Sequence, residues 1–147
     1  MEGQGYHKRD IKSKSLEAAV KYLLDTCILI DFLRGESGVY DILVSNEKAG
    51  LSMSTVTMME LVIGALNKRE VQYIQKAFRN INKIYIDQSI SEMAEDFVVC
   101  YSKSHNLQID DALIAATAIK INAELVTRNI SDFRYIPGIQ LYQFNQK

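Results

Sequence analysis

The sequence has few of the features that mark disulfide-rich, fibrous or membrane-spanning proteins. Its two cysteines are too few for a disulfide framework and lack the spacing of a zinc site. One proline and seven glycines exclude collagen-like and linker-like chains. No apolar run approaches the roughly 18–20 residues that cross a bilayer, and the first residues lack the apolar core of a signal peptide. We therefore expect a cytoplasmic protein without a membrane segment.

What is present suits one globular domain. The chain has 147 residues, of which 48% are hydrophobic and 24% charged, and its net charge is −1. Such a composition excludes wholesale disorder, and the near-neutral charge argues against a bulk electrostatic grip on nucleic acid while allowing a local one. The basic start of the chain predicts a flexible extension over residues 1–20, followed by a single domain over 21–147.

Short apolar runs alternate with segments of helical spacing. The runs predict strands at residues 22–24, 51–54, 84–86 and 124–127, with a fifth candidate at 138–141. The intervening segments predict helices at residues 26–33, 39–46, 58–67, 70–81, 89–105 and 112–122. The candidate helix caps are Thr55 or Thr57, Ser89, and Asp110 or Asp111. This alternation predicts an α/β fold with a parallel sheet of four to five strands and helices on both faces.

Acidic residues stand near the expected carboxyl ends of these strands, where open parallel sheets carry their sites. They are Asp25, Glu60, Asp111 and Asp132. Clustered carboxylates repel one another unless a cation compensates, and their oxygen atoms suit a hard divalent ion. The acids therefore predict a Mg²⁺ or Mn²⁺ site, where bound water can attack a phosphate.

Each acid also has an ordinary structural explanation, and spacing alone leaves both readings open. Asp25 can cap a helix at the end of a strand, and Glu60 can be an exposed helix acid. Asp110 suits a helix cap better than Asp111 does, and Asp132 can belong to a turn.

Four fragments of the chain carry a family resemblance: YLLDTCILIDFLRGE (22–36), STVTMMELVIGA (54–65), IDDALIAATA (109–118) and LVTRNISDF (125–133). In this order and spacing they resemble the PIN domain and, more narrowly, the VapC toxins of toxin–antitoxin pairs. The resemblance spans about residues 21–145. It implies a three-layer α/β/α sandwich around a parallel sheet of four to five strands. It also implies a Mg²⁺- or Mn²⁺-dependent endoribonuclease that cuts tRNA or rRNA, forms a homodimer and is silenced by a VapB-type antitoxin.

The resemblance assigns roles by position. It implies that Asp25, Glu60 and Asp111 hold the metal, and that Asp132 completes a second site or orients the attacking water. Polar positions near the site are matched by Thr26, Thr127 and Asn129. Arg34 and Arg128 flank the motifs and are the basic residues best placed to contact RNA, although either is also explained as solvated surface. Cys27 stands where the family commonly has Asn, and it is expected to pack as a small hydrophobe.

Other functions are weaker alternatives. A non-catalytic PIN-fold module that binds RNA or a protein is disfavoured because all four acid positions are occupied. A haloacid-dehalogenase-like phosphatase needs a second Asp two residues after the first, where this chain has Cys27. The eight tyrosines are dispersed along the sequence and predict no base-stacking platform.

Overall fold

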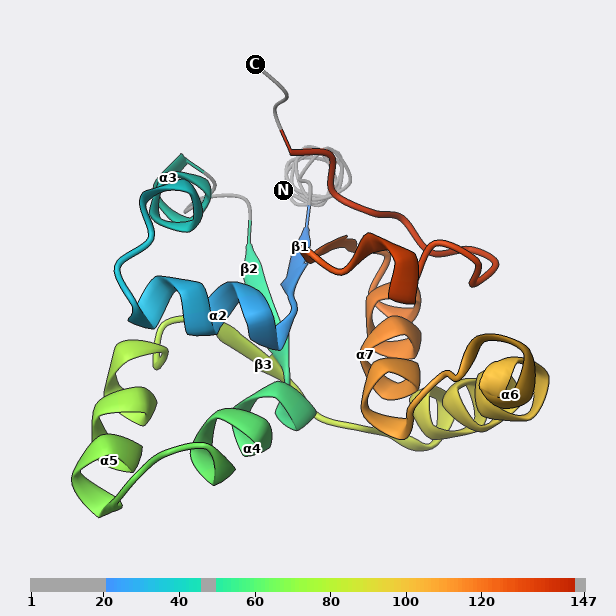
Figure 1. Ribbon diagram of the computed structural model, residues 1–147, viewed down its shortest axis with the longest axis horizontal. Helices are drawn as coiled ribbons and strands as arrows, with labels where there is room; N and C mark the ends of the chain where they lie inside the picture. The colour runs from blue at the N-terminus through green and yellow to red at the C-terminus, as the bar shows by residue number, and fades with distance from the viewer. Residues whose placement is uncertain (1–20, 46–49, 145–147) are drawn as a thin grey trace, which may run out of the picture.

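Figure 1 shows a computed structural model, which describes residues 21–45 and 50–144. The extension expected over residues 1–20 lies outside the described residues. The strands are β1 (Tyr22–Leu24), β2 (Leu51–Ser54), β3 (Asn82–Ile84) and β4 (Glu124–Val126). The helices are α2 (Thr26–Leu33), α3 (Ser37–Ser45), α4 (Thr55–Ile63), α5 (Lys68–Ala77), α6 (Gln88–His105), α7 (Ile109–Lys120) and the short 3₁₀ helix η2 (Ile130–Asp132).

The described strands form one parallel sheet in the order β3-β2-β1-β4. In β1 and β4, Leu24 lies beside Val126, so both strands end at the same edge. The candidate fifth strand is reduced to one bridge between Leu125 and Leu141. The predicted α/β fold with a parallel sheet of four to five strands is confirmed, with four strands in the described residues.

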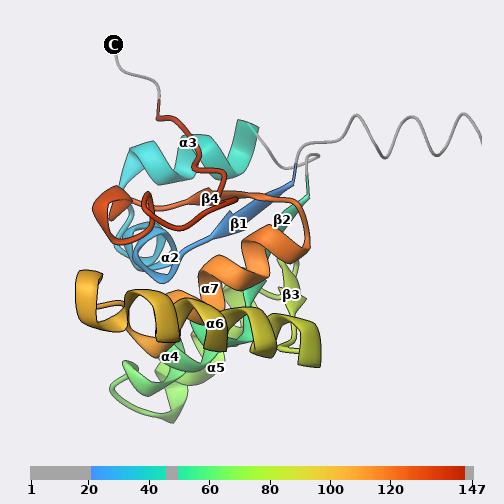
Figure 2. The same ribbon diagram turned by 90° about the vertical axis from the view of Figure 1, so that its right-hand side faces the viewer.

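Alternating side chains on the strands build two cores. Leu23 and Leu125 belong to the core shared with α6 and α7, whereas Leu24, Met53 and Val126 belong to the core shared with α2, α4 and α5. Successive side chains on a strand point to opposite faces, so β1 and β4 each contribute to both cores. Figures 1 and 2 show the corresponding layers, with α6 and α7 on one side of the sheet and α2, α4 and α5 on the other.

Helix α7 is the most deeply buried helix of the described chain. Ala112, Ala115, Ala116 and Ala118 are all fully buried. Their small side chains let the helix lie close to both the sheet and α6, which explains why this segment is almost wholly apolar. No helix among the described residues is long and apolar enough to span a membrane.

Most of the predicted helix starts lie too late in the sequence. Helix α4 begins three residues early because Ser54, extended at the end of β2, accepts a hydrogen bond from the Val56 N–H. In α6 the cap is Asp87, whose carboxylate accepts the Ile90 N–H at 2.9 Å, and not Ser89. Helix α7 also begins three residues before the predicted start. It follows Gln108, whose side chain makes no capping hydrogen bond.

Two other boundaries also lie nearer the N-terminus than the sequence predicts. Strand β3 ends at Ile84, where the sequence predicts a strand over residues 84–86. Helix α5 begins at Lys68 because the Asn67 side chain caps it through the Glu70 N–H. Capping side chains therefore set the starts of α4, α5 and α6, which apolar spacing alone places too late.

The cap of α6 predicts unequal effects of two neighbouring substitutions. Asp87→Ala removes the acceptor of the Ile90 N–H, whereas Ser89→Ala removes only a hydroxyl that donates to Asp87. We expect Asp87→Ala to lower the urea midpoint of unfolding more than Ser89→Ala does, as measured by circular dichroism. Equal midpoints for the two variants would contradict the assigned cap.

Candidate active site

Asp25 lies at the carboxyl end of β1 with 5% of its surface exposed. Its Oδ1 accepts the Thr26 N–H at 2.8 Å, so it caps α2, and its Oδ2 accepts the Thr127 hydroxyl at 2.7 Å. Burial raises the pKa of Asp25, and these two hydrogen bonds oppose the shift. Asp25 therefore caps α2, and the same carboxylate also contacts Thr127 just after β4.

Thr127 reaches Asp25 because β4 is the neighbour of β1 in the sheet. The buried Thr127 oxygen also accepts the Asn129 N–H at 3.0 Å, which ties the following loop to the strand end. The half-buried Cys27 thiol lies 3.6 Å from Asp25 Oδ2 and 3.7 Å from Thr127 Oγ1. Burial raises the pKa of Cys27, so the thiol form is favoured beside the carboxylate.

Glu60 enters the site from α4. The Thr26 hydroxyl donates to Glu60 Oε1 at 2.6 Å. The distance from Thr26 Oγ1 to Oγ1 of the buried Thr57 is 3.2 Å. Burial and the neighbouring Asp110 raise the pKa of Glu60, whereas the bond from Thr26 lowers it. The adjacent residues Asp25 and Thr26 therefore link two acids of the cluster. Asp25 is itself one of them, and the Thr26 hydroxyl holds the other, Glu60, by a hydrogen bond.

Asp110 and Asp111 lie together in the first turn of α7. Burial is the largest cause that raises the pKa of Asp111 from 3.8 to about 7, followed by the charges of Asp110, Asp25, Asp132 and Glu60. The charge of Asp110 acts on both Asp25 and Glu60 and raises their pKa values. Asp110, whose position suits a helix cap, lies instead in the acidic cluster. The signal was its position beside Asp111, which the late helix start concealed.

Asp132 completes the cluster from η2, after β4. It is exposed, and its charge acts on Asp111 and on the half-buried Tyr135. Tyr135 stacks on His105 with ring centroids 4.0 Å apart, and Tyr101 packs edge-on against both rings. Residues that are dispersed in the sequence thus form an aromatic cluster beside the acids.

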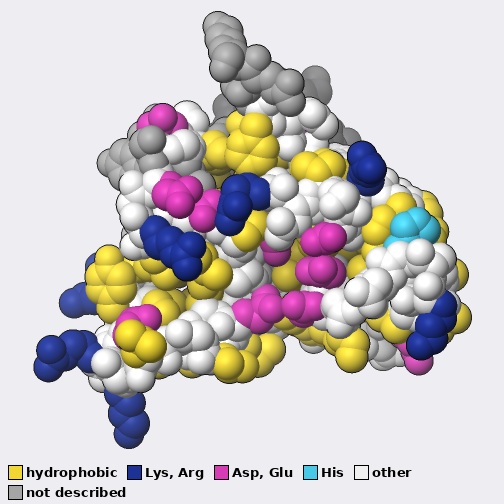
Figure 3. Space-filling model, viewed as in Figure 1, with side chains coloured by type: hydrophobic (Ala, Val, Ile, Leu, Met, Phe, Trp, Pro, Cys, Tyr) yellow, Lys and Arg dark blue, Asp and Glu magenta, His cyan; other side chains and the backbone are white. Residues whose placement is uncertain are grey.

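Acidic side chains gather in the middle of the face shown in Figure 3. The acids that interact with one another are Asp25, Glu60, Asp110, Asp111 and Asp132. Among the described residues, no three His, Cys, Asp or Glu side chains converge into a compact metal-ligand group. The donors are all carboxylate oxygens whose repulsion a hard divalent cation would relieve, so their chemistry fits Mg²⁺ or Mn²⁺.

The two arginines expected near RNA have different surroundings. Arg34 is exposed and lines a hollow between α2 and α4 that also contains Glu60. Arg128 pairs with Asp31, a buried acid that the sequence analysis did not single out. Arg128 Nη2 donates to Asp31 Oδ1 at 3.2 Å, and Nε lies 2.6 Å from Oδ2 as an ion pair. The pair joins α2 to the loop that carries Asn129.

The PIN domain family matches residues 22–138. This chain belongs to the PIN-domain family. Its relatives include ribonuclease VapC10 of Mycobacterium tuberculosis, which is 36% identical over 115 residues, covering 76% of this chain and 84% of that protein. Ribonuclease VapC19 of the same organism is 31% identical over 122 residues, covering 80% and 96%. A solved toxin–antitoxin complex from Klebsiella pneumoniae matches with a TM-score of 0.65 and 35% identity, covering 80% of this chain and 94% of that one.

The buried Asp31–Arg128 pair predicts a loss of stability in Arg128→Ala. The substitution leaves the Asp31 carboxylate buried without its cation, at a cost of about 2 kcal/mol in the free energy of unfolding. Urea denaturation measures the cost. Adding Asp31→Asn should recover part of it, because a buried amide is less costly than a buried charge. A loss below about 0.5 kcal/mol in Arg128→Ala would contradict the role of the pair.

The raised pKa of Asp111 predicts a pH-dependent stability in the absence of divalent cations. The folded protein binds a proton more tightly at Asp111 than the unfolded chain does, so this contribution is present below pH 4 and is lost as the pH rises towards 7. We expect Asp111→Asn to be more stable than the wild type in EDTA at pH 8, with the difference shrinking towards pH 4. Thermal unfolding measures both.

Asp96→Asn is the matched control, because it makes the same change on the exposed surface of α6. It should not alter the pH dependence. Mg²⁺ at pH 8 should raise the unfolding temperature of the wild type more than that of Asp111→Asn. A wild type that is more stable than Asp111→Asn in EDTA at pH 8 would show that repulsion at Asp111 is not significant.

Proposed function

We propose that this PIN-domain protein is the toxin of a VapBC-type pair, an endoribonuclease that uses Mg²⁺ or Mn²⁺ to hydrolyse RNA phosphodiester bonds. The observation that carries the proposal is the gathering of five carboxylates at one sheet edge, where burial and the charges of the other four raise the pKa of Asp111 to about 7. The curated relatives VapC10 and VapC19 bear the name ribonuclease, which supports the same activity.

Asp25, Glu60 and Asp111 are the proposed metal ligands. When bound, the cation would activate a water molecule and neutralise the charge that develops on the phosphate. Thr26 and Thr127 hold the first two carboxylates in place through hydrogen bonds of 2.6 Å to Glu60 and 2.7 Å to Asp25. Their hydroxyls fix oxygen atoms that would otherwise move apart by repulsion.

Asp132 and Asp110 surround these ligands. The exposed Asp132, whose charge acts on Asp111, is proposed to complete a second, weaker cation site or to orient the attacking water. Asp110 adds negative charge beside Glu60 and Asp25 and so favours cation binding. Arg34 is the better of the two proposed RNA contacts, because the guanidinium of Arg128 already pairs with Asp31.

A VapB-type antitoxin is the proposed protein partner, as in the toxin–antitoxin complex from Klebsiella pneumoniae. The hollow between α2, α4 and α5 includes Leu33, Leu61 and Ile74 and reaches Glu60. Near it, Ile63 and Leu66 are 83% and 87% exposed. An antitoxin peptide lying there would cover apolar surface and bring a cationic side chain to the carboxylates. The homodimer stays a prediction.

The proposed function predicts that cleavage of RNA depends on both the cation and Asp111. Purified protein without antitoxin should cut total RNA into discrete fragments in Mg²⁺ or Mn²⁺, and none in EDTA. Asp111→Asn should lower the rate by about a hundredfold or more, since it removes a ligand worth several kcal/mol in the transition state. Primer extension would locate the fragment ends.

Asp96→Asn should cleave as the wild type does, because its carboxylate is exposed on α6 away from the acidic cluster. Unchanged cleavage by Asp111→Asn would overturn the proposed site. Folded wild-type protein that neither binds Mn²⁺ nor cuts RNA would favour the non-catalytic PIN-fold module.

A further inference from the structure

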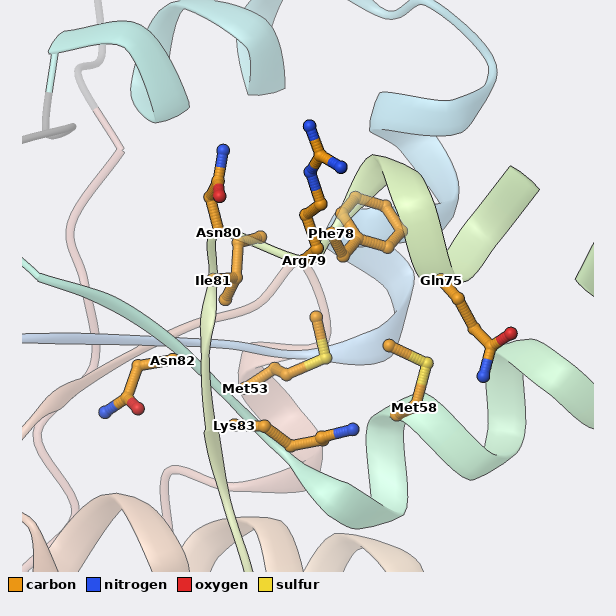
Figure 4. Close-up of a pocket in the computed structure, with 9 residues that line it drawn as sticks. All are labelled: Met53, Met58, Gln75, Phe78, Arg79, Asn80, Ile81, Asn82 and Lys83. Carbon is orange, nitrogen blue, oxygen red and sulfur yellow. The ribbon is translucent and has the colours of Figure 1, made fainter. Parts of the chain in front are cut away.

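A second hollow lies beside the edge strand β3, apart from the carboxylates. Its volume is about 580 Å³, and it is lined by residues 78–83 together with Met53, Met58 and Gln75. We call it the β3 groove. Figure 4 shows the side chains of Met53, Phe78 and Met58 around it. Met53 and Phe78 are almost fully buried, so the apolar floor that a ligand can reach comes mainly from the half-buried Met58 and Ile81.

The charged side chains of the β3 groove are both cationic. Arg79 and Lys83 are exposed, and neither forms an ion pair with a described residue. Two other hollows contain acids. The hollow between α2 and α4 contains Glu60 and Glu70. A hollow beside the Asp31–Arg128 pair contains Asp31 and Glu36. The β3 groove is therefore suited to an anion in a way that these two hollows are not.

The rim of the groove also carries side-chain amides. Gln75, Asn80 and Asn82 are exposed, and within the described chain none of their amide groups makes a hydrogen bond. Amides both donate and accept, so they can pair with the polar edge of a planar ring that lies on an apolar floor. This combination suits a nucleobase.

An exposed aromatic ring follows directly on the strand. Tyr85 is 67% exposed, and the Lys83 ammonium lies 5.7 Å from the centre of its ring. Side chains two residues apart on an extended chain point to the same side. A cation of the groove and an exposed aromatic ring thus stand together at the end of β3, as they do where proteins bind single-stranded nucleic acid.

We propose that the β3 groove binds one nucleotide of the RNA substrate, with its phosphate at Arg79 and Lys83 and its base on the apolar floor. The inference rests on the proposed ribonuclease function and extends it to a contact outside the carboxylate site. Helix α4 links the two places. Met58 lines the groove, whereas Thr57 and Glu60 face Thr26 in the acidic cluster.

The occupant is inferred to be RNA because cations, unpaired amides, an apolar floor and an exposed ring match phosphate and base together. A second copy of the chain or a peptide would have to bring its own acids to Arg79 and Lys83. Phosphates bring that charge with every nucleotide. The contact would also let the protein select RNA through shape and base identity, which the carboxylates alone cannot read.

The experiment measures binding of a fluorescein-labelled single-stranded RNA of twelve nucleotides and mixed sequence, by anisotropy in EDTA so that no cleavage occurs. Arg79→Gln/Lys83→Gln should raise Kd at least fivefold. It should also lower the slope of log Kd against log salt by about 0.7, because the contact with one phosphate of a single strand is lost. Lys68→Gln/Arg69→Gln removes the same charge from exposed residues of α5 outside the groove, and it should leave both values unchanged.

A second readout does not depend on charge. RNA that contains 4-thiouridine should cross-link to the peptide covering residues 79–85 in the wild type, and mass spectrometry locates the cross-link. Equal weakening by both double variants, or cross-links only elsewhere, would overturn the inference. Changed sedimentation of Arg79→Gln/Lys83→Gln with unchanged RNA affinity would identify a second copy as the occupant and also overturn it.

The outcomes separate this inference from the proposed nuclease. If the wild type cleaves RNA and the groove variant binds RNA as the wild type does, only the groove inference fails. If the wild type binds RNA through the groove without cleaving it in Mg²⁺, only the nuclease fails. A wild type that binds no RNA overturns the groove inference whatever its other activities.

Discussion

Mutual repulsion among carboxylates at one sheet edge is the constraint around which this protein is organised. Parallel strands end together, so the turns that follow them deliver acids from distant parts of the chain to one place. Burial and four neighbouring acids raise the pKa of Asp111 to about 7. The fold holds this arrangement with hydroxyl donors, Thr26 towards Glu60 and Thr127 towards Asp25. A divalent cation would remove the remaining repulsion, which links cation binding to the stability of the fold.

The strands and the main acids could be predicted from the sequence for a physical reason. Residues 22–24 and 124–126 are buried between two layers of helices, so they form apolar runs that stand out from helical spacing. The rule that sites lie at the carboxyl ends of such strands then selects Asp25 and Asp111. The resemblance to PIN domains points to the same positions. The family match over residues 22–138 confirms the resemblance itself.

The features that were missed depend on contacts or helix phase that spacing does not contain. Asp110 was assigned to a cap because apolar spacing placed the start of α7 three residues late. The Asp31–Arg128 pair joins residues 97 positions apart, and nothing local marks either partner. The β3 groove arises because α4 and α5 leave part of the sheet beside β3 open, which only the packed structure reveals.

The proposed cation site depends on repulsion within the carboxylate cluster. The most direct test is to measure the pKa of the Asp111 carboxyl by a carbon-13 NMR titration. The Asp111→Asn variant assigns the resonance. The account predicts titration near pH 7 in EDTA, and a clear fall of the pKa when saturating Mg²⁺ is added. A carboxyl that titrates near 3.8 in EDTA, or whose pKa does not respond to Mg²⁺, would contradict it.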